Sequence, residues 1–176
     1  MIDEPVPKQV LVVMGVSGSG KTTIALPLAA RLGWPFLEGD DLHPAANVAK
    51  MHSGRPLDDS DRWPWLDAIA AWIDARISAG EPGVVTCSAL KRAYRDRLLG
   101  VRKGVRLVFL HADRDLLAER LARRTGHFMP PSLLDSQLAT LEPPEPGENA
   151  IVVDISLPPE QVIATLIARL REPLTP

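Results

Sequence analysis

The residues with the clearest chemical meaning form a glycine-rich octapeptide, GVSGSGKT, at positions 15–22. It matches the pattern G-x-x-x-x-G-K-[ST] and stands between an apolar run at 10–14 and a stretch of helical character. Its glycines let backbone N–H groups turn onto a phosphate where a Cβ would obstruct them. Lys21 adds a cation for the β- and γ-phosphates, and Thr22 adds a hydroxyl for Mg²⁺. A Gly/Ser turn before an ordinary helix is the alternative, but the order of strand, loop and helix favours binding of a nucleoside triphosphate. The predicted nucleotide-binding residues are Gly15, Val16, Ser17, Gly18, Ser19, Gly20, Lys21 and Thr22.

A second group of chemically capable residues is acidic and lies in the segment FLEGDDLHP at 36–44. Glu38 and Asp40 are two residues apart, so they share a face of an extended segment, and the end of a strand in an open α/β sheet faces the ligand crevice. We expect Glu38 to reach Mg²⁺ through a water and Asp40 to accept a hydrogen bond from a substrate hydroxyl, which is an arrangement suited to phosphoryl transfer to an alcohol. The alternative is an acidic turn that caps the next helix, and we expect that role for Asp41.

A third group is cationic and lies in RDLLAERLARR at 114–124. Arg120 and Arg124 are four residues apart, which predicts that they share a helical face. The following segment, TGHFMPPSLLDSQ, contains Gly and Pro and suits a mobile flap. Such a flap excludes water and brings arginines to a transferring phosphoryl group. A solvated basic face paired with neighbouring carboxylates is the alternative.

The elements that must position these groups alternate between strand and helix, which predicts a parallel sheet with helices on both faces. Apolar runs predict strands, and residues at helical spacing, among them Trp65 and Trp72, predict helices with a core face. The predicted strands are 10–14, 35–38, 84–87, 105–111 and 151–154, and the predicted helices are 21–32, 61–78, 91–99, 114–124 and 159–170.

Composition limits the class of protein. The length of 176 residues and the hydrophobic fraction of 45% predict one globular domain, 1–176. A formal charge of −2 gives no general attraction to nucleic acid or to an anionic membrane. Cys87 is the single cysteine, and its apolar neighbours predict a buried thiol. Apolar runs are too short for a signal or transmembrane segment, so we expect a cytoplasmic protein with small-molecule partners. No N-K-x-D guanine-reading motif occurs, and the strand VVTC lacks a terminal aspartate for Mg²⁺.

Several motifs together carry a family resemblance over residues 10–170. GVSGSGKT, FLEGDDLHP, KMHSGRPLDDSDRWPWL, CSALKRAYRDRL, RTGHF and SQLATLE occur in the order and close spacing of the thermoresistant type of bacterial gluconokinase. The sequence resembles that family, which implies ATP-dependent phosphorylation of D-gluconate at its C6 hydroxyl with Mg²⁺. It also implies a three-layer fold like that of nucleoside-monophosphate kinases, with five parallel strands, a mobile lid at about 124–137, and a homodimer.

The resemblance implies roles for particular residues. Gluconate carries a carboxylate and several hydroxyls, so its pocket needs cations and hydrogen-bonding groups. The expected cations are Arg62, Lys91 and Arg95, of which Lys91 and Arg95 would share a helix face. Asp40 and His43 would bind hydroxyls, although a histidine before a proline is also a common structural hydrogen bonder. The expected catalytic residues are Lys21, Asp40, Arg120 and Arg124.

Two other functions stay open from the sequence. One is a kinase of the same architecture that acts on a shikimate-like acid, a nucleotide or an adenylylsulfate. The other is a nucleotide-binding regulatory module without turnover. A passive module needs only the phosphate loop, so the acidic strand end and the arginines count against it.

Overall fold

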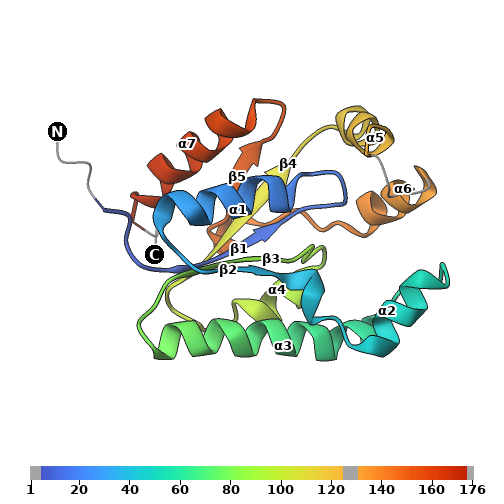
Figure 1. Cartoon of the computed structure of the whole chain (residues 1–176), viewed down its shortest axis with the longest axis horizontal. Coiled ribbons are helices and arrows are strands. Elements are labelled where there is room, and N and C mark those ends of the chain that lie inside the picture. The colour runs from blue at the N-terminus through green and yellow to red at the C-terminus, as the bar shows by residue number, and fades with distance from the viewer. Residues whose placement is uncertain (1–4, 125–130, 174–176) are drawn as a thin grey trace.

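A parallel sheet of five strands organises the molecule, in the spatial order β2-β3-β1-β4-β5 (Figure 1). The computed structural model describes residues 5–124 and 131–173. Val12 in the central strand pairs with Val85 on one side and Leu107 on the other. The strands are β1 (Val10–Met14), β2 (Phe36–Glu38), β3 (Gly83–Thr86), β4 (Val105–His111) and β5 (Ile151–Asp154). Their order and direction confirm the predicted α/β class.

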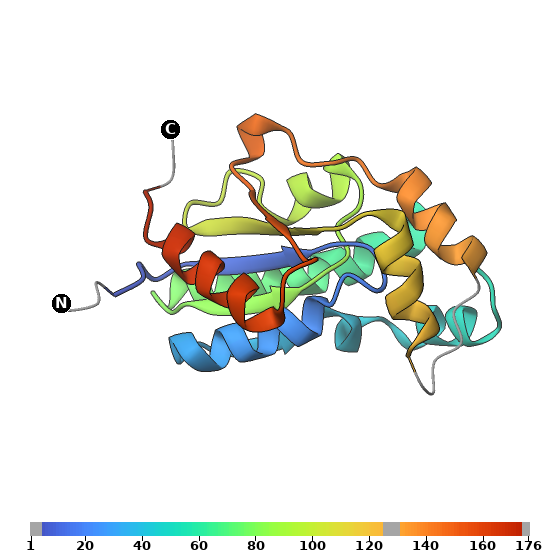
Figure 2. The ribbon, with the colours of Figure 1, turned by 90° about the horizontal axis from the view of Figure 1, so that it is seen from above.

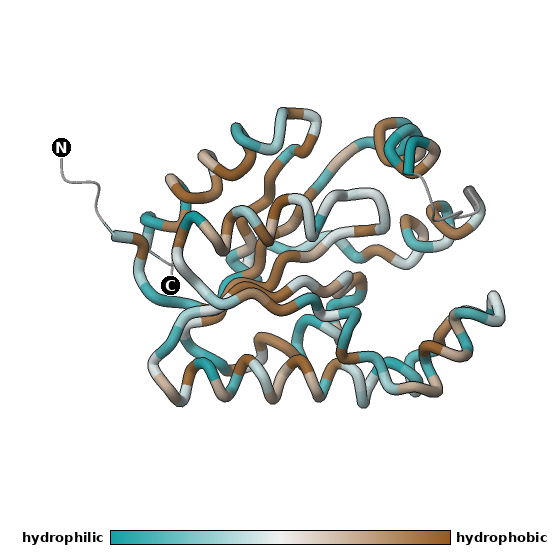
Figure 3. The backbone as a smooth tube through the Cα atoms, viewed as in Figure 1, coloured by the Kyte–Doolittle hydropathy of each residue, from teal (hydrophilic) through white to brown (hydrophobic). Residues whose placement is uncertain are grey.

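Helices cover both faces of this sheet because successive side chains of its strands point to opposite sides. Leu11 and Val13 lie in one apolar core with α1 (Lys21–Leu32) and α7 (Pro159–Leu170). Val10, Val12 and Met14 lie in a second core with α3 (Asp59–Ser78) and α4 (Arg92–Leu98). The continuous apolar run of β1 is therefore explained by burial on both faces. Hydrophobic residues concentrate on these central strands, and hydrophilic ones on outer turns (Figure 3).

Four of the remaining elements lie near the end of the sheet where the strands terminate. They are the 3₁₀ turn η1 (Gly39–Leu42) and the helices α2 (Ala45–His52), α5 (Arg114–Ala122) and α6 (Pro131–Thr140). Figure 2 shows α5 and α6 side by side at this end. A further 3₁₀ turn, η2 (Pro146–Glu148), precedes β5.

Most predicted bounds agree with the structure, and the differences have local causes. The helix predicted at 61–78 begins at Asp59, because Asp58 and Asp61 form a capping box with two backbone hydrogen bonds of 2.9 Å. The helices α2 and α6 were not predicted. The predicted lid at 124–137 is partly helical, because 131–137 belong to α6, while 125–130 lie outside the described residues. No helix in the described part of the chain is long and apolar enough to cross a membrane.

Candidate active site

The phosphate loop joins β1 to α1 and has the backbone that its glycines predict. Gly18 and Gly20 have φ of 83° and 80°, a left-handed conformation that favours glycine. The Lys21 amine folds back onto the loop and donates to the carbonyls of Gly15 at 3.0 Å and Val16 at 3.4 Å. Burial lowers the pKa of Lys21, while Asp40 and Glu38 oppose that shift and Arg124 adds to it. These groups are therefore close enough to interact electrostatically around one site.

Two features of the loop, a buried hydroxyl and the position of the Lys21 amine, support its fit to a nucleotide phosphate. The Ser19 hydroxyl is buried and has no hydrogen-bond partner within the described ranges. Within the described part of the chain, the hydrogen-bond acceptors of the Lys21 amine are two loop carbonyls, and α1 begins at Lys21 itself. An anion placed there would meet the Lys21 cation and the positive end of a helix.

Glu38 ends β2 and is held by two threonine hydroxyls from other elements. Thr22 in α1 donates to Glu38 Oε2 at 2.5 Å, and Thr86 at the end of β3 donates to Oε1. The structure thus brings together the two residues predicted to serve Mg²⁺. In the described residues no group of three or more His, Cys, Asp or Glu side chains that could hold a metal ion occurs.

Gly39 makes this arrangement possible. A Cβ on Gly39 would lie 1.9 Å from the Thr86 carbonyl oxygen, so no other residue fits without movement of the backbone. The Gly39 N–H donates to Thr86 Oγ1 at 3.1 Å, and its carbonyl accepts from the Trp65 indole at 2.8 Å. Trp65 is buried, as its predicted core role requires, and it also fixes the end of β2.

Asp40 follows in η1, with a side chain that is 73% exposed. His43 lies behind it, stacked on Trp65 with ring centroids 4.2 Å apart, and its Nε2 is 3.9 Å from Asp40 Oδ1. The Asn47 amide is 3.3 Å from His43 Nδ1 and donates to the Asp61 carbonyl at 2.8 Å. Asp40 is thus free to meet a ligand, whereas His43 is largely enclosed by protein.

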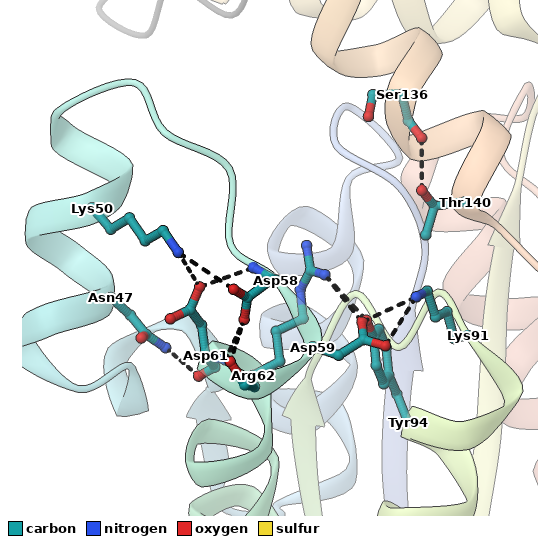
Figure 4. A network of polar contacts seen from close by, with 11 residues as sticks. Asn47, Lys50, Asp58, Asp59, Asp61, Arg62, Lys91, Tyr94, Ser136 and Thr140 are labelled. Atoms are coloured by element: carbon teal, nitrogen blue, oxygen red, sulfur yellow. Dashed lines mark hydrogen bonds and ion pairs between the residues drawn. The ribbon is translucent and has the colours of Figure 1, made fainter.

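A second polar cluster joins the start of α3 to the start of α4 (Figure 4). Its Arg62, like Asp40, is close enough to His43 to interact with it electrostatically. Asp59 accepts from the Lys91 amine at 3.0 and 3.2 Å and from the Tyr94 hydroxyl. Arg62 donates to the Tyr94 oxygen at 3.1 Å and lies 3.9 Å from Asp59 Oδ1. Hydrogen bonds from Tyr94 and Lys91 lower the pKa of Asp59. The hydrogen bond between Lys91 and Asp59 also raises the pKa of Lys91. Both residues are therefore charged at neutral pH. We call Asp59, Arg62, Lys91 and Tyr94 the α3–α4 cluster.

Arg95 is not part of this cluster, so the prediction that it shares a face with Lys91 is wrong. Lys91 has extended backbone and precedes α4, which begins at Arg92. The Arg95 side chain is 1% exposed and donates to both oxygens of Glu148 at 2.6 and 3.1 Å. It also donates to the carbonyls of Ala89 and Leu90. All three guanidinium nitrogens of Arg95 thus donate to acceptors within the fold.

Arg120 and Arg124 do not share a helical face either, because α5 ends at Ala122. Arg120 donates to the carbonyl of Ile155, just beyond β5. Arg124 lies outside the helix, is exposed, and interacts electrostatically with Lys21. Of the two, Arg124 is the cation that the structure brings to the phosphate loop.

Several residues at the site were missed from the sequence. Asp59 and Tyr94 occur inside two quoted motifs, DDSDRW and KRAYRD, and their polar types next to predicted binding cations were the available signal. Gln137 lies in SQLATLE and contacts Ser17 in the phosphate loop. Thr86 ends β3, the strand in which the sequence lacks a terminal aspartate for Mg²⁺. Its hydroxyl donates a hydrogen bond to Glu38.

The fold and the site together define a class. A phosphate loop between β1 and α1, with the carboxylate of Glu38 at the end of β2 and that of Asp40 in the turn η1 that follows, is the framework of a P-loop kinase.

The particular family follows from comparison with known proteins. A family model described as an AAA domain matches residues 10–144. The chain is 54% identical over 157 residues to a gluconokinase from Gluconobacter oxydans (strain 621H), covering 89% of this chain and 88% of that one. It is 41% identical over 164 residues to the thermoresistant gluconokinase of Escherichia coli (strain K12), covering 93% and 94%. A solved gluconokinase from Sinorhizobium meliloti 1021 superposes with a TM-score of 0.85 at 48% identity, covering 95% of this chain and 93% of that one. The chain belongs to the gluconokinase family, which confirms the resemblance found in its motifs.

Proposed function

We propose that this kinase transfers the γ-phosphoryl group of ATP to the C6 hydroxyl of D-gluconate, giving 6-phospho-D-gluconate and ADP. The observation that carries this proposal is the juxtaposition of two sites. The phosphate loop, Glu38 and Asp40 form one, and the cationic α3–α4 cluster beside them forms the other. The electrostatic effect of both Asp40 and Arg62 on His43 supports their proximity.

The nucleotide side of the site has clear chemical roles. ATP supplies the phosphoryl group, and Mg²⁺ neutralises charge on its phosphates. The N–H groups of residues 15–22, other than those of Ser17 and Ser19, which donate to Gln137 and to the Val16 carbonyl, would hold the phosphates together with the Lys21 amine. Thr22 and Glu38 would hold the cation and one of its waters. Arg124 would add positive charge where the transferring group develops negative charge.

Asp40 is the residue that we assign to the acceptor hydroxyl. Its exposed carboxylate can accept a hydrogen bond from that hydroxyl and turn the oxygen toward the nucleotide. A loose phosphoryl-transfer transition state demands little basicity, so orientation is its main contribution. His43 would act on Asp40 from behind, and in this structure its partners are protein groups.

The α3–α4 cluster suits a hydroxylated monocarboxylate. Arg62 and Lys91 carry two positive charges and Asp59 carries one negative charge, which leaves one positive charge for the substrate carboxylate. Asp59 and the Tyr94 oxygen can in addition exchange hydrogen bonds with hydroxyls. Arg62 and Lys91 remain our candidates for substrate binding, whereas the enclosed Arg95 supports the fold.

The first test is ADP formation with ATP, Mg²⁺ and a panel of D-gluconate, related sugar acids, shikimate, adenylylsulfate and nucleoside monophosphates. We expect selective turnover of D-gluconate. Turnover of another acceptor would keep the kinase mechanism and discard the assigned pocket, and no turnover with any acceptor would favour the regulatory module.

Asp40→Ala should lower kcat by about 100-fold or more while ATP affinity stays within about threefold, because the lost contact is to the acceptor. Asp41→Ala is the matched control, since Asp41 is the neighbouring exposed carboxylate in the same turn. Equal losses in both variants would remove Asp40 from its special role.

Dependence on Mg²⁺, a homodimer and a cytoplasmic location complete the proposal, and the family resemblance supports them. Metal titration of activity and sedimentation of the purified protein test the first two.

A further inference from the structure

Gln137 in α6 makes two hydrogen bonds to a single residue of the phosphate loop. The Ser17 N–H donates to Gln137 Oε1 at 2.7 Å, and Gln137 Nε2 donates to Ser17 Oγ at 3.0 Å. The two residues are 120 positions apart, so this contact joins distant parts of the chain. Neither bond is needed to form α6 itself.

The first of these bonds fixes the chemistry of the second. A backbone N–H can only donate, so the amide atom that faces the Ser17 nitrogen must be oxygen. The other amide atom is therefore nitrogen, and it donates to the Ser17 hydroxyl oxygen. The hydroxyl proton of Ser17 must then point away from Gln137, and within the described residues it has no protein acceptor.

The helix that carries Gln137 is firmly attached near this contact. Leu134, one turn earlier in α6, is 1% exposed. Asp135 accepts from Arg114 of α5 at 2.7 and 3.1 Å. The helix α5 also contacts the loop, because a Cβ on Gly18 would lie 2.9 Å from Leu121 Cγ. Two neighbouring helices thus contact consecutive loop residues, Ser17 and Gly18.

The position of the Lys21 amine indicates which end of the loop would face a terminal phosphate, and Ser17 lies next to that end. The Lys21 amine, which in this motif reaches the β- and γ-phosphates, lies against the carbonyls of Gly15 and Val16, immediately before Ser17. The N–H groups at the start of α1 would then serve the inner phosphates.

We propose that Gln137 is a positioning residue that orients Ser17, so that the Ser17 hydroxyl donates a hydrogen bond to the terminal phosphate of ATP. This inference rests on the proposed use of ATP and adds to it a route by which α6 acts on the phosphate loop. A hydroxyl that donates only to the terminal phosphate distinguishes ATP from ADP.

The test compares Gln137→Leu, Ser17→Ala and the double variant by calorimetric binding of ADP and of the β,γ-imido analogue of ATP. Each single variant should lose about tenfold in affinity for the triphosphate analogue, because a hydrogen bond to a charged group is lost. Affinity for ADP should change by less than about threefold. The double variant should be no weaker than the weaker single variant, since Gln137 acts through Ser17.

Two further variants sharpen the result. Gln137→Glu keeps an acceptor for the Ser17 N–H but makes the second atom an acceptor too, which turns the Ser17 proton away from the phosphate and adds a negative charge. It should therefore bind the analogue more weakly than Gln137→Leu. Thr140→Val is the control on the same helix, because in the described residues the Thr140 hydroxyl donates to the Ser136 carbonyl within α6 and makes no bond to the phosphate loop.

Equal losses of affinity for ADP and the triphosphate analogue, or additive losses in the double variant, would overturn the proposal. Gln137 would then have a merely structural role, and its variants would also have a lowered Tm. The binding measurements need no acceptor substrate. A failure of gluconate turnover in the unmodified enzyme would therefore count against the proposed function without affecting this test.

Discussion

Lys91 and Arg95 lie four residues apart, and their side chains have entirely different surroundings. Lys91 is half-buried and belongs to the α3–α4 cluster, where it pairs with Asp59, while Arg95 is enclosed with Glu148. The sequence alone showed two cations at helical spacing. It did not show that the backbone at Lys91 is extended, nor that a glutamate 53 positions later closes over Arg95.

This difference leads to a prediction of stability. Arg95→Met should lower the free energy of unfolding by about 3–5 kcal/mol, because it removes the buried partner of the Glu148 carboxylate and leaves it the more exposed Arg92 at 3.8 Å and the Glu145 N–H. Arg97→Met, which removes a pair with Asp67 whose side chains are 54% and 47% exposed, should cost less than about 1 kcal/mol. Urea denaturation of both variants makes the comparison. A loss of gluconate affinity in a stable Arg95→Met protein would return Arg95 to the substrate site.

Residue types predicted much of the site. Lys21, Thr22, Glu38 and Asp40 come together as expected, because the loop motif and the strand end fix their places. The sequence did not predict three residues of the site, Asp59, Tyr94 and Gln137, because their partners come from other elements. Spacing within a single sequence carries no information about contacts between elements.

The segment that joins β2 to η1 shows the same limit for elements. Its strand was predicted within one residue, but the close approach of Gly39 to Thr86 depends on the pairing of β2 with β3. The helix α2 was missed because Asn47 is its one buried residue in the described structure, so no apolar stripe marks it. The helix α6 was missed because the Gly and Pro residues before it favoured the prediction of a flap.

Gly39→Ala tests this segment. The added methyl group would collide with the Thr86 carbonyl, so we expect a loss of more than about 2 kcal/mol of stability and a loss of activity through displacement of Glu38 and Asp40. Gly147→Ala is the control, because its Cβ would meet no atom within 4 Å. Thermal denaturation and steady-state kinetics report the two effects. Similar behaviour of the two variants would mean that the backbone at Gly39 can move freely.

At the scale of the whole molecule, two apolar cores hold the sheet, and Cys87 lies in one of them beside the phosphate site. Its side chain is 1% exposed, and burial raises the pKa of its thiol to about 12. The thiolate is the reactive form, so both access and ionisation protect this cysteine. The predicted buried thiol is confirmed.

Cys87 can therefore report unfolding of the whole domain. Alkylation at pH 8 should be roughly 1,000-fold or more slower in the folded protein than in urea. If labelling requires global unfolding, ATP at 100 times its Kd should slow it by about 100-fold more. Rapid labelling that ATP does not affect would show local opening at the end of β3 instead.

The stacking of His43 on Trp65 and its contact with Asn47 bear on acid tolerance. The Asn47 amide directs a hydrogen to His43 Nδ1, which requires the neutral ring with its proton on Nε2, the nitrogen nearer Asp40. Burial lowers the pKa of His43, an effect that Asp40 opposes and Arg62 reinforces. Because the folded pKa lies below the usual value, the stability that this neutral ring contributes is present above pH 6.5 and is lost as the pH falls toward the lowered value. His43 therefore keeps one protonation state through mild acidification. The role that we propose for Asp40 would lose the support of this neutral ring only in stronger acid.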